Sequence, residues 1–326
     1  MEQVITPPTD GDRKRKRIFD IYSANLQLLI IEGILTDVNL KYSVTYICPI
    51  CLDHFSVADL NQSLSNPLTL EDAPPKSLGG KANVLTCKSC NNKCGTDVDY
   101  HLSQQMTELD KREFRPGMEF AAEFENEGKT VQGRIKVGID GTFKVLHIEK
   151  NNNPKTLGDY VSTTRSGSGV QIKYKKTNVE PHKIQLALLK TAYLLVFQKY
   201  GYAFILNPIY NRVREQLRNP DRLIYPLEFW FNAPFPEQAI GVPFIIEPGL
   251  ASIMATFILK TDFSERMFSA IIPLTTVPIE KVISELKNRF EIEKRFEVSM
   301  YSMSEIDCLH DKEAILKMLN WIQSKS

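Results

Sequence analysis

Cys48-Pro-Ile-Cys51 and Cys87-Lys-Ser-Cys90 are the two segments that decide the fold of the first third of this chain. Thirty-five residues separate them. Two such C-x-x-C pairs present four thiolates to one tetrahedral ion, and zinc is the usual ion for this ligand set. We therefore predict that Cys48, Cys51, Cys87 and Cys90 bind one structural zinc ion. Cys94 and Cys308 have no partner at ligand spacing, so we expect ordinary thiols there.

The overall composition is that of an ordinary soluble globular protein. Of 326 residues, 43% are hydrophobic and 24% are charged, and the formal net charge is +1. A chain so close to neutrality needs a locally basic surface if it is to bind nucleic acid. No apolar run reaches the roughly 18 residues of a membrane span, and the cysteine pairs indicate a reducing compartment. We expect a cytoplasmic protein of two domains, without a membrane segment.

Further motifs lie around the two cysteine pairs in a fixed order. The first pair is followed by Leu70-Glu71-Asp72-Ala73-Pro74-Pro75-Lys76-Ser77-Leu78-Gly79-Gly80, and Asn83 and Asn91-Asn92-Lys93 flank the second pair. Residues 48–101 thereby resemble the four-cysteine type of the HNH endonucleases. The pattern of that family joins C-x-x-C, an acidic-His-x-x-Pro strand end, a Gly-Gly turn, an Asn before a Leu-x-Cys strand, and C-x-x-C-[HN]. The resemblance leaves the rest of the chain unaccounted for.

The resemblance implies a small ββα-metal fold, in which zinc holds a β-hairpin to a helix and a separate Mg²⁺ or Mn²⁺ ion is catalytic. It puts Glu71 and Asn91 at the positions of the ligands of the catalytic ion. It puts Asn83 at the position of the Asn that braces the loop, and Asp72 at the position of the general base. It therefore implies an endonuclease that hydrolyses phosphodiester bonds in nucleic acid, with DNA as the expected partner.

Asp72 departs from the family pattern, which has a histidine at that position. Imidazole has a pKa of about 6.5 and accepts a proton from water at physiological pH, whereas an ordinary aspartate, with a pKa of about 3.9, is a weaker base. Asp72 is thus either a weak base or a further oxygen ligand beside Glu71 and Asn91, in a donor set that suits a hard ion. His54 and His101 are the other candidates in this segment for activating water.

Two functions compete for these residues. The first is a metal-dependent endonuclease of the kind fused to other domains in defence-type effectors. The second is a catalytically degenerate HNH zinc module that binds nucleic acid or protein. We favour the endonuclease, because Glu71, Asn83 and Asn91 are all present although the histidine is not.

The charges of the first domain give only weak support for DNA binding. Residues 1–115 carry 13 Lys and Arg against 15 Asp and Glu, a net charge of −2. The basic run at residues 13–17 begins a predicted helix over residues 16–34, where such charges more often form a solvated face. The other local cluster of basic residues lies around the second cysteine pair and consists of Lys76, Lys81, Lys88 and Lys93.

Residues 116–326 are predicted to form a second α+β domain after the turn at Arg115-Pro116-Gly117. A helix apolar on every face, at residues 182–200, is expected to be its buried centre. Residues 151–169 have the composition of a loop. Strands are predicted at 118–124, 130–137, 143–149, 170–175, 224–231, 241–246, 251–259 and 266–274, and helices at 278–290 and 311–323. Because no catalytic motif occurs here, we expect this domain to sense a ligand, form a homo-oligomer or recognise a regulatory partner.

Overall fold

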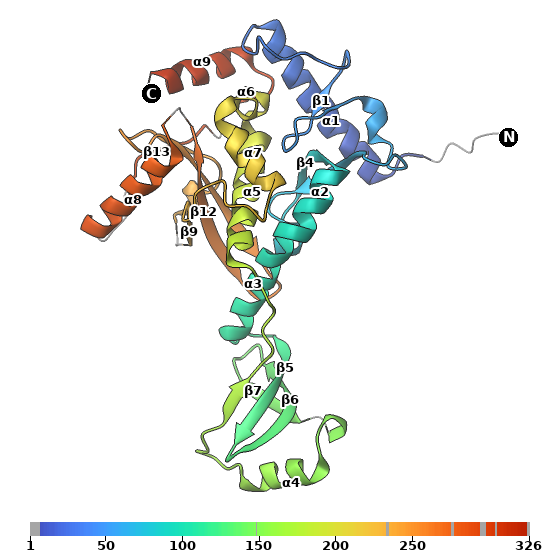
Figure 1. Cartoon of the computed structure of the whole chain (residues 1–326), viewed down its shortest axis with the longest axis vertical. Helices are drawn as coiled ribbons and strands as arrows, with labels where there is room; N and C mark the ends of the chain where they lie inside the picture. The colour runs from blue at the N-terminus through green and yellow to red at the C-terminus, as the bar shows by residue number, and fades with distance from the viewer. Residues whose placement is uncertain are drawn as a thin grey trace, which may run out of the picture. The chain divides into compact units, whose positions relative to one another are not determined.

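The computed structural model describes residues 7–147, 149–232, 235–274, 277–293, 298–303 and 305–324 (Figure 1). Helices and antiparallel strands are mixed, so the chain is an α+β protein, as predicted. It forms two compact units. Unit 1 comprises residues 1–102, 180–259 and 266–326, and unit 2 comprises residues 103–179 and 260–265.

This division differs from the predicted one, which separated residues 1–115 from residues 116–326. The segment 180–259 belongs to the same unit as the cysteine pairs. The reason is α5 (Pro181–Tyr200), whose apolar side chains cover its whole circumference and need neighbours on every side. Part of that cover comes from the cysteine segment, since the Tyr193 hydroxyl donates to the carbonyl of Pro49 at 2.6 Å.

The cysteine segment of unit 1 consists of two short antiparallel hairpins followed by a helix. The strands are β1 (Tyr46–Ile47), β2 (His54–Phe55), β3 (Leu68–Asp72) and β4 (Ala82–Cys87), and the helix is α2 (Lys88–Cys94). The chain then continues into α3 (Tyr100–Arg112). Helix α1 (Asp10–Ile31) begins six residues before the predicted position 16, because Thr9 and Asp12 form a capping box at its N-terminus.

Helix α5 is buried, as predicted, but it is the centre of the core of unit 1 and not of a separate domain over residues 116–326. Its Phe197 ring stacks on Tyr22 of α1 with the ring centroids 4.4 Å apart. Its Tyr200 ring stacks on Phe244 of the sheet at 5.2 Å. The helix thus packs between α1 and the sheet, and a strand and another helix share its cover.

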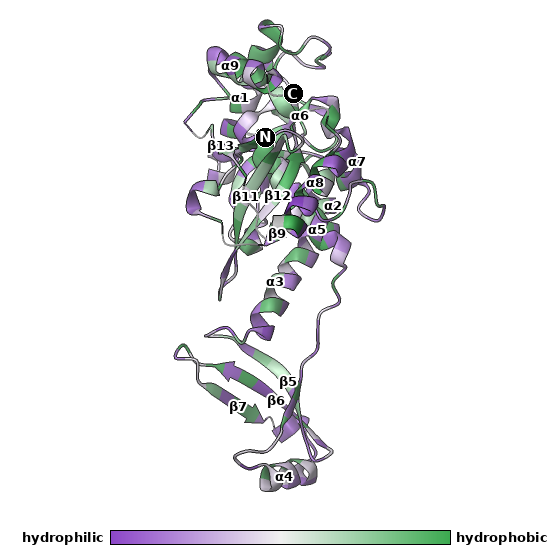
Figure 2. Cartoon of the chain, turned by 90° about the vertical axis from the view of Figure 1, so that its left-hand side faces the viewer, coloured by the Kyte–Doolittle hydropathy of each residue, from purple (hydrophilic) through white to green (hydrophobic). Residues whose placement is uncertain are grey.

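The sheet of unit 1 has five strands in the order β13-β10-β11-β12-β9. These are β9 (Trp230–Asn232), β10 (Phe244–Ile245), β11 (Ser252–Lys260), β12 (Glu265–Pro273) and β13 (Met300–Tyr301). Strands β11 and β12 are largely buried and strongly apolar (Figure 2). The remaining helices are α6 (Tyr202–Ile205), α7 (Asn211–Arg218), α8 (Ile279–Glu293) and α9 (Lys312–Gln323). None of the helices among the described residues is long and apolar enough to cross a membrane.

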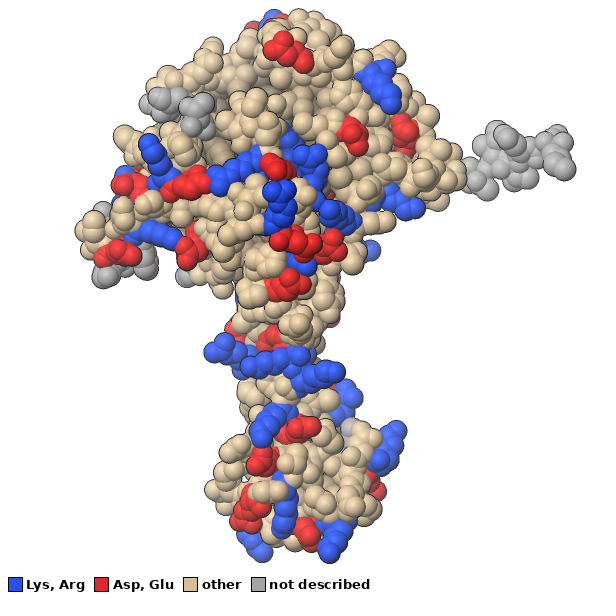
Figure 3. Space-filling view, viewed as in Figure 1, with Lys and Arg blue, Asp and Glu red and all other residues tan. Residues whose placement is uncertain are grey.

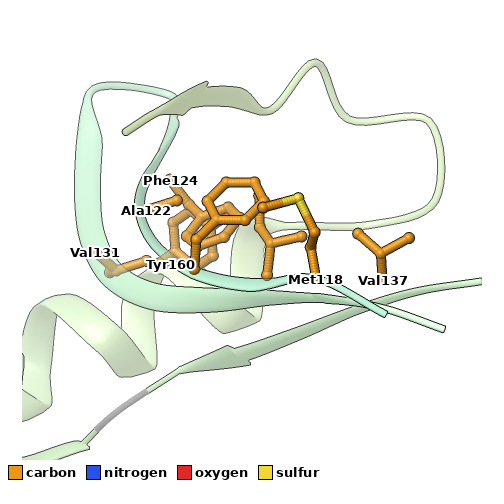
Figure 4. Close-up of a cluster of buried hydrophobic side chains, with 8 residues drawn as sticks. Met118, Ala122, Phe124, Val131, Val137 and Tyr160 are labelled. Carbon is orange, nitrogen blue, oxygen red and sulfur yellow. The ribbon is translucent and has the colours of Figure 1, made fainter. Parts of the chain in front are cut away.

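Unit 2 contains a four-stranded antiparallel sheet in the order β7-β6-β5-β8. Its strands are β5 (Glu119–Asn126), β6 (Lys129–Val137), β7 (Phe143–His147) and β8 (Gln171–Lys173), close to the predicted ranges. Alternate residues of β5 and β6 face a small core that Tyr160 completes (Figure 4).

The predicted loop at residues 151–169 is wrong in part, because it contains α4 (Pro154–Thr163). The Asn153 side chain accepts hydrogen bonds from the first backbone N–H groups, and Pro154 occupies the first turn. Both are favourable at a helix N-terminus, although the polar, glycine-containing sequence resembles a loop.

Candidate metal centre

The first cysteine pair lies in the turn between β1 and β2. The Cys48 N–H donates to the carbonyl of Asp53, and the Leu52 N–H donates to the carbonyl of Cys48, both at 2.9 Å. Leu52 has a φ of 64°, in the left-handed region, and this conformation reverses the chain into β2. The turn therefore holds Cys48 and Cys51 on one side of the chain reversal.

The core of unit 1 anchors this turn from behind. The Tyr202 hydroxyl accepts a hydrogen bond from the Ile47 N–H and donates one to the Ile47 carbonyl, both at 2.8 Å. The Tyr46 hydroxyl donates to the carbonyl of Leu85 on β4 at 2.8 Å. These buried bonds fix the first cysteine pair against the strand that carries the second.

The second pair bridges the end of β4 and the first turn of α2. Cys87 is the last strand residue, paired with Leu68, and also the N-cap of α2, so that Cys90 follows in the first turn of the helix. The Cys87 N–H approaches the Cys48 sulfur at 3.5 Å. An N–H donor of this kind stabilises negative charge on a thiolate ligand.

The four sulfurs form a cluster that can hold a metal ion such as zinc. All four lie within 4.8 Å of one another, and the Sγ atoms of Cys51 and Cys87 are 3.8 Å apart. A Zn–S bond of about 2.3 Å in a tetrahedron requires sulfurs about 3.8 Å apart, so the donor set and its spacing fit zinc. The predicted grouping of Cys48, Cys51, Cys87 and Cys90 is confirmed.

The two remaining cysteines lie outside this cluster. Burial raises the pKa of the Cys94 thiol to about 12, which keeps it protonated. The buried Cys308 thiol lies 3.6 Å from the sulfur of Met318. Both are core thiols, in agreement with the spacing argument.

Glu71, the first predicted ligand of a catalytic ion, is buried against a cation of the protein itself. Its side chain is only 4% exposed, and its Oε1 lies 2.7 Å from Nζ of Lys190. The hydroxyl of Thr86 donates to its Oε2 at 3.0 Å. The same Lys190 ammonium lies 2.5 Å from Oδ2 of Asp99. Lys190, which is 1% exposed and comes from α5, thus joins the two carboxylates.

The environment of this triad keeps Lys190 charged. Burial raises the pKa of both Glu71 and Asp99, because their ionised forms lose hydration. Burial alone would lower the pKa of Lys190, but the two neighbouring carboxylates outweigh it and raise that pKa. Oδ1 of Asp99 is buried and has no hydrogen-bond partner in the described part of the chain. The single ammonium is therefore the main compensation for both carboxylates.

Asp72 and Asn83 lie at an irregularity of the β3–β4 hairpin. Glu71 pairs with Val84 and Asp72 with Ala82, so Asn83 is the extra residue of a β-bulge. The Asp72 side chain is half-buried, and burial raises its pKa, while Lys76 and Lys14 oppose that effect. The two adjacent carboxylates consequently have different surroundings: Glu71 is paired with Lys190, whereas Asp72 remains accessible to solvent.

Asn91, the second predicted ligand, connects α2 to β3. Its Nδ2 donates to the carbonyl of Leu70 at 2.8 Å and to the hydroxyl of Thr69 at 3.0 Å. These bonds give Asn91 a structural role in holding the helix to the hairpin.

The two histidines suggested for water activation are engaged by the backbone. Nδ1 of His101 accepts the N–H of Glu180, and Nδ1 of His54 accepts the N–H of Lys41, both at 3.2 Å. Burial is the main cause that lowers the pKa of both histidines, which favours the neutral ring. Nothing in these contacts joins either imidazole to Asp72.

Sequence reasoning missed Lys190 and Asp99. Lys190 does carry a signal, because it is the single charge within the apolar run from residue 184 to residue 197. A lone lysine in a buried helix needs an acidic partner, but the sequence does not identify that partner.

The basic cluster predicted near the two cysteine pairs is solvent-exposed, and Lys93 donates to the carbonyl of Arg218 at 2.5 Å.

No protein-family model matches the chain, and no curated protein or solved structure matches it. The likeness to the HNH endonucleases therefore rests on the residues of the cysteine segment alone. What the structure adds is a four-cysteine cluster that can hold a metal ion, and a buried Glu71–Lys190–Asp99 triad.

Proposed function

We propose that this chain is a nucleic-acid-binding protein whose HNH-like zinc module maintains the fold and does not cleave phosphodiester bonds. The observation that carries this proposal is the ammonium of Lys190 at 2.7 Å from Glu71. Of the two functions considered from the sequence, the non-hydrolytic module fits this geometry better.

A magnesium ion at Glu71 would have to displace the Lys190 ammonium or bind beside it. Mg²⁺ binds carboxylate oxygens at about 2.0–2.1 Å in a strict octahedron and retains several waters. The triad offers no such room, since Lys190 is fully enclosed and already joined to both carboxylates. The repulsion between a divalent ion and an ammonium in contact with the same carboxylate also opposes binding.

Support for nucleic acid as the partner comes from the resemblance and from local charge. Lys14 of α1 and Lys76 beyond β3 are both exposed, and both lie close enough to Asp72 to influence its pKa. Cations gathered at the end of the hairpin suit a phosphate backbone without requiring a basic chain.

The deciding experiment combines cleavage and binding on the zinc-loaded full chain. The cleavage assay uses supercoiled plasmid, linear duplex and single-stranded oligonucleotides, each incubated with Mg²⁺, with Mn²⁺ or with a chelator that binds both ions. Binding of the same nucleic acids is measured by fluorescence anisotropy. We expect binding without cleavage. Metal-dependent cleavage that Asp72→Asn abolishes would overturn the proposal.

A metal-dependent endonuclease is the second candidate, and Asp72 is the observation that favours it. Its accessible carboxylate has a pKa raised by burial, which makes it a better proton acceptor than an ordinary aspartate. For this candidate the ion would be held by Asp72 without Glu71. Cleavage by the wild type, lost in Asp72→Asn and retained in Glu71→Gln, is the result that would establish it.

A further inference from the structure

Unit 2 carries a continuous row of aromatic rings across the core-facing side of its sheet. The Phe143 ring lies 5.2 Å from that of Phe114, which lies 6.0 Å from Phe120, and Phe120 lies 5.6 Å from Tyr174. The row therefore runs from β7 at one edge of the sheet to the segment that follows β8 at the other.

One end of this row is open to solvent, and Tyr174 at the other end is partly exposed. Phe143 is 58% exposed, although its pairing with Val137 directs it to the same face as the core. Val145 and Ile172, on the same face of the edge strands, are each 44% exposed. Helix α4 covers the core around Tyr160, whereas Phe143, paired with the last residue of β6, lies at the opposite end of the sheet.

Basic residues gather at this same end. The strand register puts Lys136 opposite both Glu119 and Lys144, at the start of β5 and of β7, on the face of the sheet opposite to the rings. The segment after β8 continues in the same direction, and α3 ends there. The cations of this end are all exposed and have no ion-pair partner among the described residues: Arg112, Lys136, Lys144, Lys175 and Lys176. Figure 3 shows Lys and Arg side chains crowded along this part of unit 2.

The acidic residues of α3 and early β5 do not cancel this charge. Glu108 pairs with Lys111, Glu113 with Arg115 and Glu119 with Arg134. Asp110 is buried and accepts hydrogen bonds from the hydroxyls of Thr261 and Ser264. The excess of positive charge therefore comes from the unpaired cations.

A cleft brings Tyr174, at one end of the row, together with two of these cations. It has a volume of about 740 Å³ and lies between one face of α3 and the segment after β8. Its walls include Leu109, Ile172 and Tyr174, together with Arg112 and Lys176. An apolar and aromatic surface bordered by the exposed cations Arg112 and Lys176 is therefore available within a single unit.

We propose that this end of unit 2 binds single-stranded nucleic acid, with bases stacked on Phe143 and Tyr174 and phosphates on Arg112 and Lys176. Unpaired bases expose the faces that stack on aromatic side chains, and a basic groove tracks the backbone. In a duplex those base faces are already stacked on one another, and an acidic peptide has no bases to stack on the aromatic rings. This inference rests on the proposed function and names the substrate class and the site.

The test measures anisotropy of a fluorescein-labelled oligothymidine or oligouridine with the full chain. Two double variants each remove two positive charges. The site variant combines Arg112→Gln with Lys176→Gln. The matched control combines Lys129→Gln, next to the β5–β6 turn, with Lys155→Gln on α4. Phe143→Leu removes the most exposed ring, and Phe143→Tyr retains a ring. A duplex of the same length and polyglutamate serve as competitors.

We expect the site double variant to weaken binding and to reduce the slope of log K against log salt by about 1.4, because each cation contributes about 0.7 for single strands. Phe143→Leu is expected to weaken binding about fivefold or more, as loss of one stacked base does. Phe143→Tyr and the control variant should retain wild-type affinity.

Three results would overturn the inference. They are unchanged affinity in the site variants, an equal loss in the control, and displacement by duplex or polyglutamate as effective as by the unlabelled single strand. If the wild type still binds nucleic acid in the first two cases, the proposed function stands and only this site is wrong. Cleavage by the wild type would overturn the proposed function while leaving this binding site intact, and a wild type that binds no nucleic acid refutes both.

Discussion

The ammonium of Lys190 lies 2.7 Å from the carboxylate of Glu71, so a helix near the middle of the chain meets the strand that leads away from the first cysteine pair. Oδ2 of Asp99 lies 2.5 Å from the same ammonium. The triad therefore links α5, β3 and the helical turn Gly95–Asp99 that precedes α3. It couples the folding of the metal segment to that of the central helix, which explains why they belong to one compact unit.

Replacing the central cation should strongly destabilise unit 1. Lys190→Met leaves Glu71 and Asp99 buried without compensation, and breaking one side of a buried ionic group costs about 3–5 kcal/mol. Adding Glu71→Gln and Asp99→Asn removes the stranded charges and should recover much of that loss. Urea unfolding followed by circular dichroism measures both changes.

Lys183→Met provides the control for that variant. Lys183 is on the same helix but pairs with Glu180 and Asp221, whose side chains are exposed. Surface pairs contribute about 0–1 kcal/mol, so its loss should be small. An equal loss in Lys183→Met would mean that the charge change on α5, and not the buried triad, causes the effect.

Asp72 should make the protein less stable as the pH rises. Its pKa in the folded chain is raised above the ordinary 3.8, chiefly by burial, so the folded state holds this proton more tightly than the unfolded state. The resulting stabilisation is complete below the ordinary pKa and is lost as the pH rises through the raised one. Asp72→Asn is thus expected to raise the urea midpoint at pH 7 and to leave it unchanged at acidic pH. A lower midpoint at pH 7 would show that Lys14 and Lys76 dominate instead.

The sequence was sufficient to predict those parts of the fold and of the site that one short-range pattern determines. The C-x-x-C spacing predicted the four-cysteine cluster, and the apolar run at residues 182–200 predicted a buried helix, because both depend on neighbours along the chain. The alternating strands of unit 2 were predicted nearly to the residue for the same reason.

Long-range pairing explains what the sequence could not supply. Glu71 and Asp72 are adjacent in a motif that suggests one metal site, but the bulge at Asn83 and the arrival of Lys190 give them different environments. The domain boundary was misplaced for a related reason. Unit 2 begins at Ser103, within α3 and before the predicted turn, and nothing local indicates that the chain returns to unit 1 at residue 180.

The Gly-Gly turn of the hairpin should tolerate no side chain at its second position. A Cβ on Gly80 would lie 1.5 Å from the carbonyl oxygen of Pro74, a backbone atom that cannot move aside freely. Gly80→Ala is expected to destabilise the chain by about 2 kcal/mol or more, as overpacking of a rigid site does.

Gly95 is the matched control in the same segment. It has helical dihedral angles, and a Cβ there meets nothing within 4 Å. Because alanine favours a helix over glycine by up to about 1 kcal/mol, Gly95→Ala should be neutral or stabilising. Thermal unfolding of the two variants side by side distinguishes steric exclusion at Gly80 from a general intolerance of the segment.

Removal of the metal should unfold the cysteine segment and loosen α5 with it. The folded chain is expected to contain about one zinc per molecule by elemental analysis, bound by four thiolates. Cys87→Ser should lose the ion and the protection of β3, β4 and α2 from hydrogen exchange, since the binding energy of a structural metal is part of the folding energy. Cys94→Ala, which alters a buried thiol outside the cluster, should retain the zinc. A wild-type protein that remains folded and metal-free after purification without chelator would show that the core around Tyr193 and Tyr202 suffices without the ion.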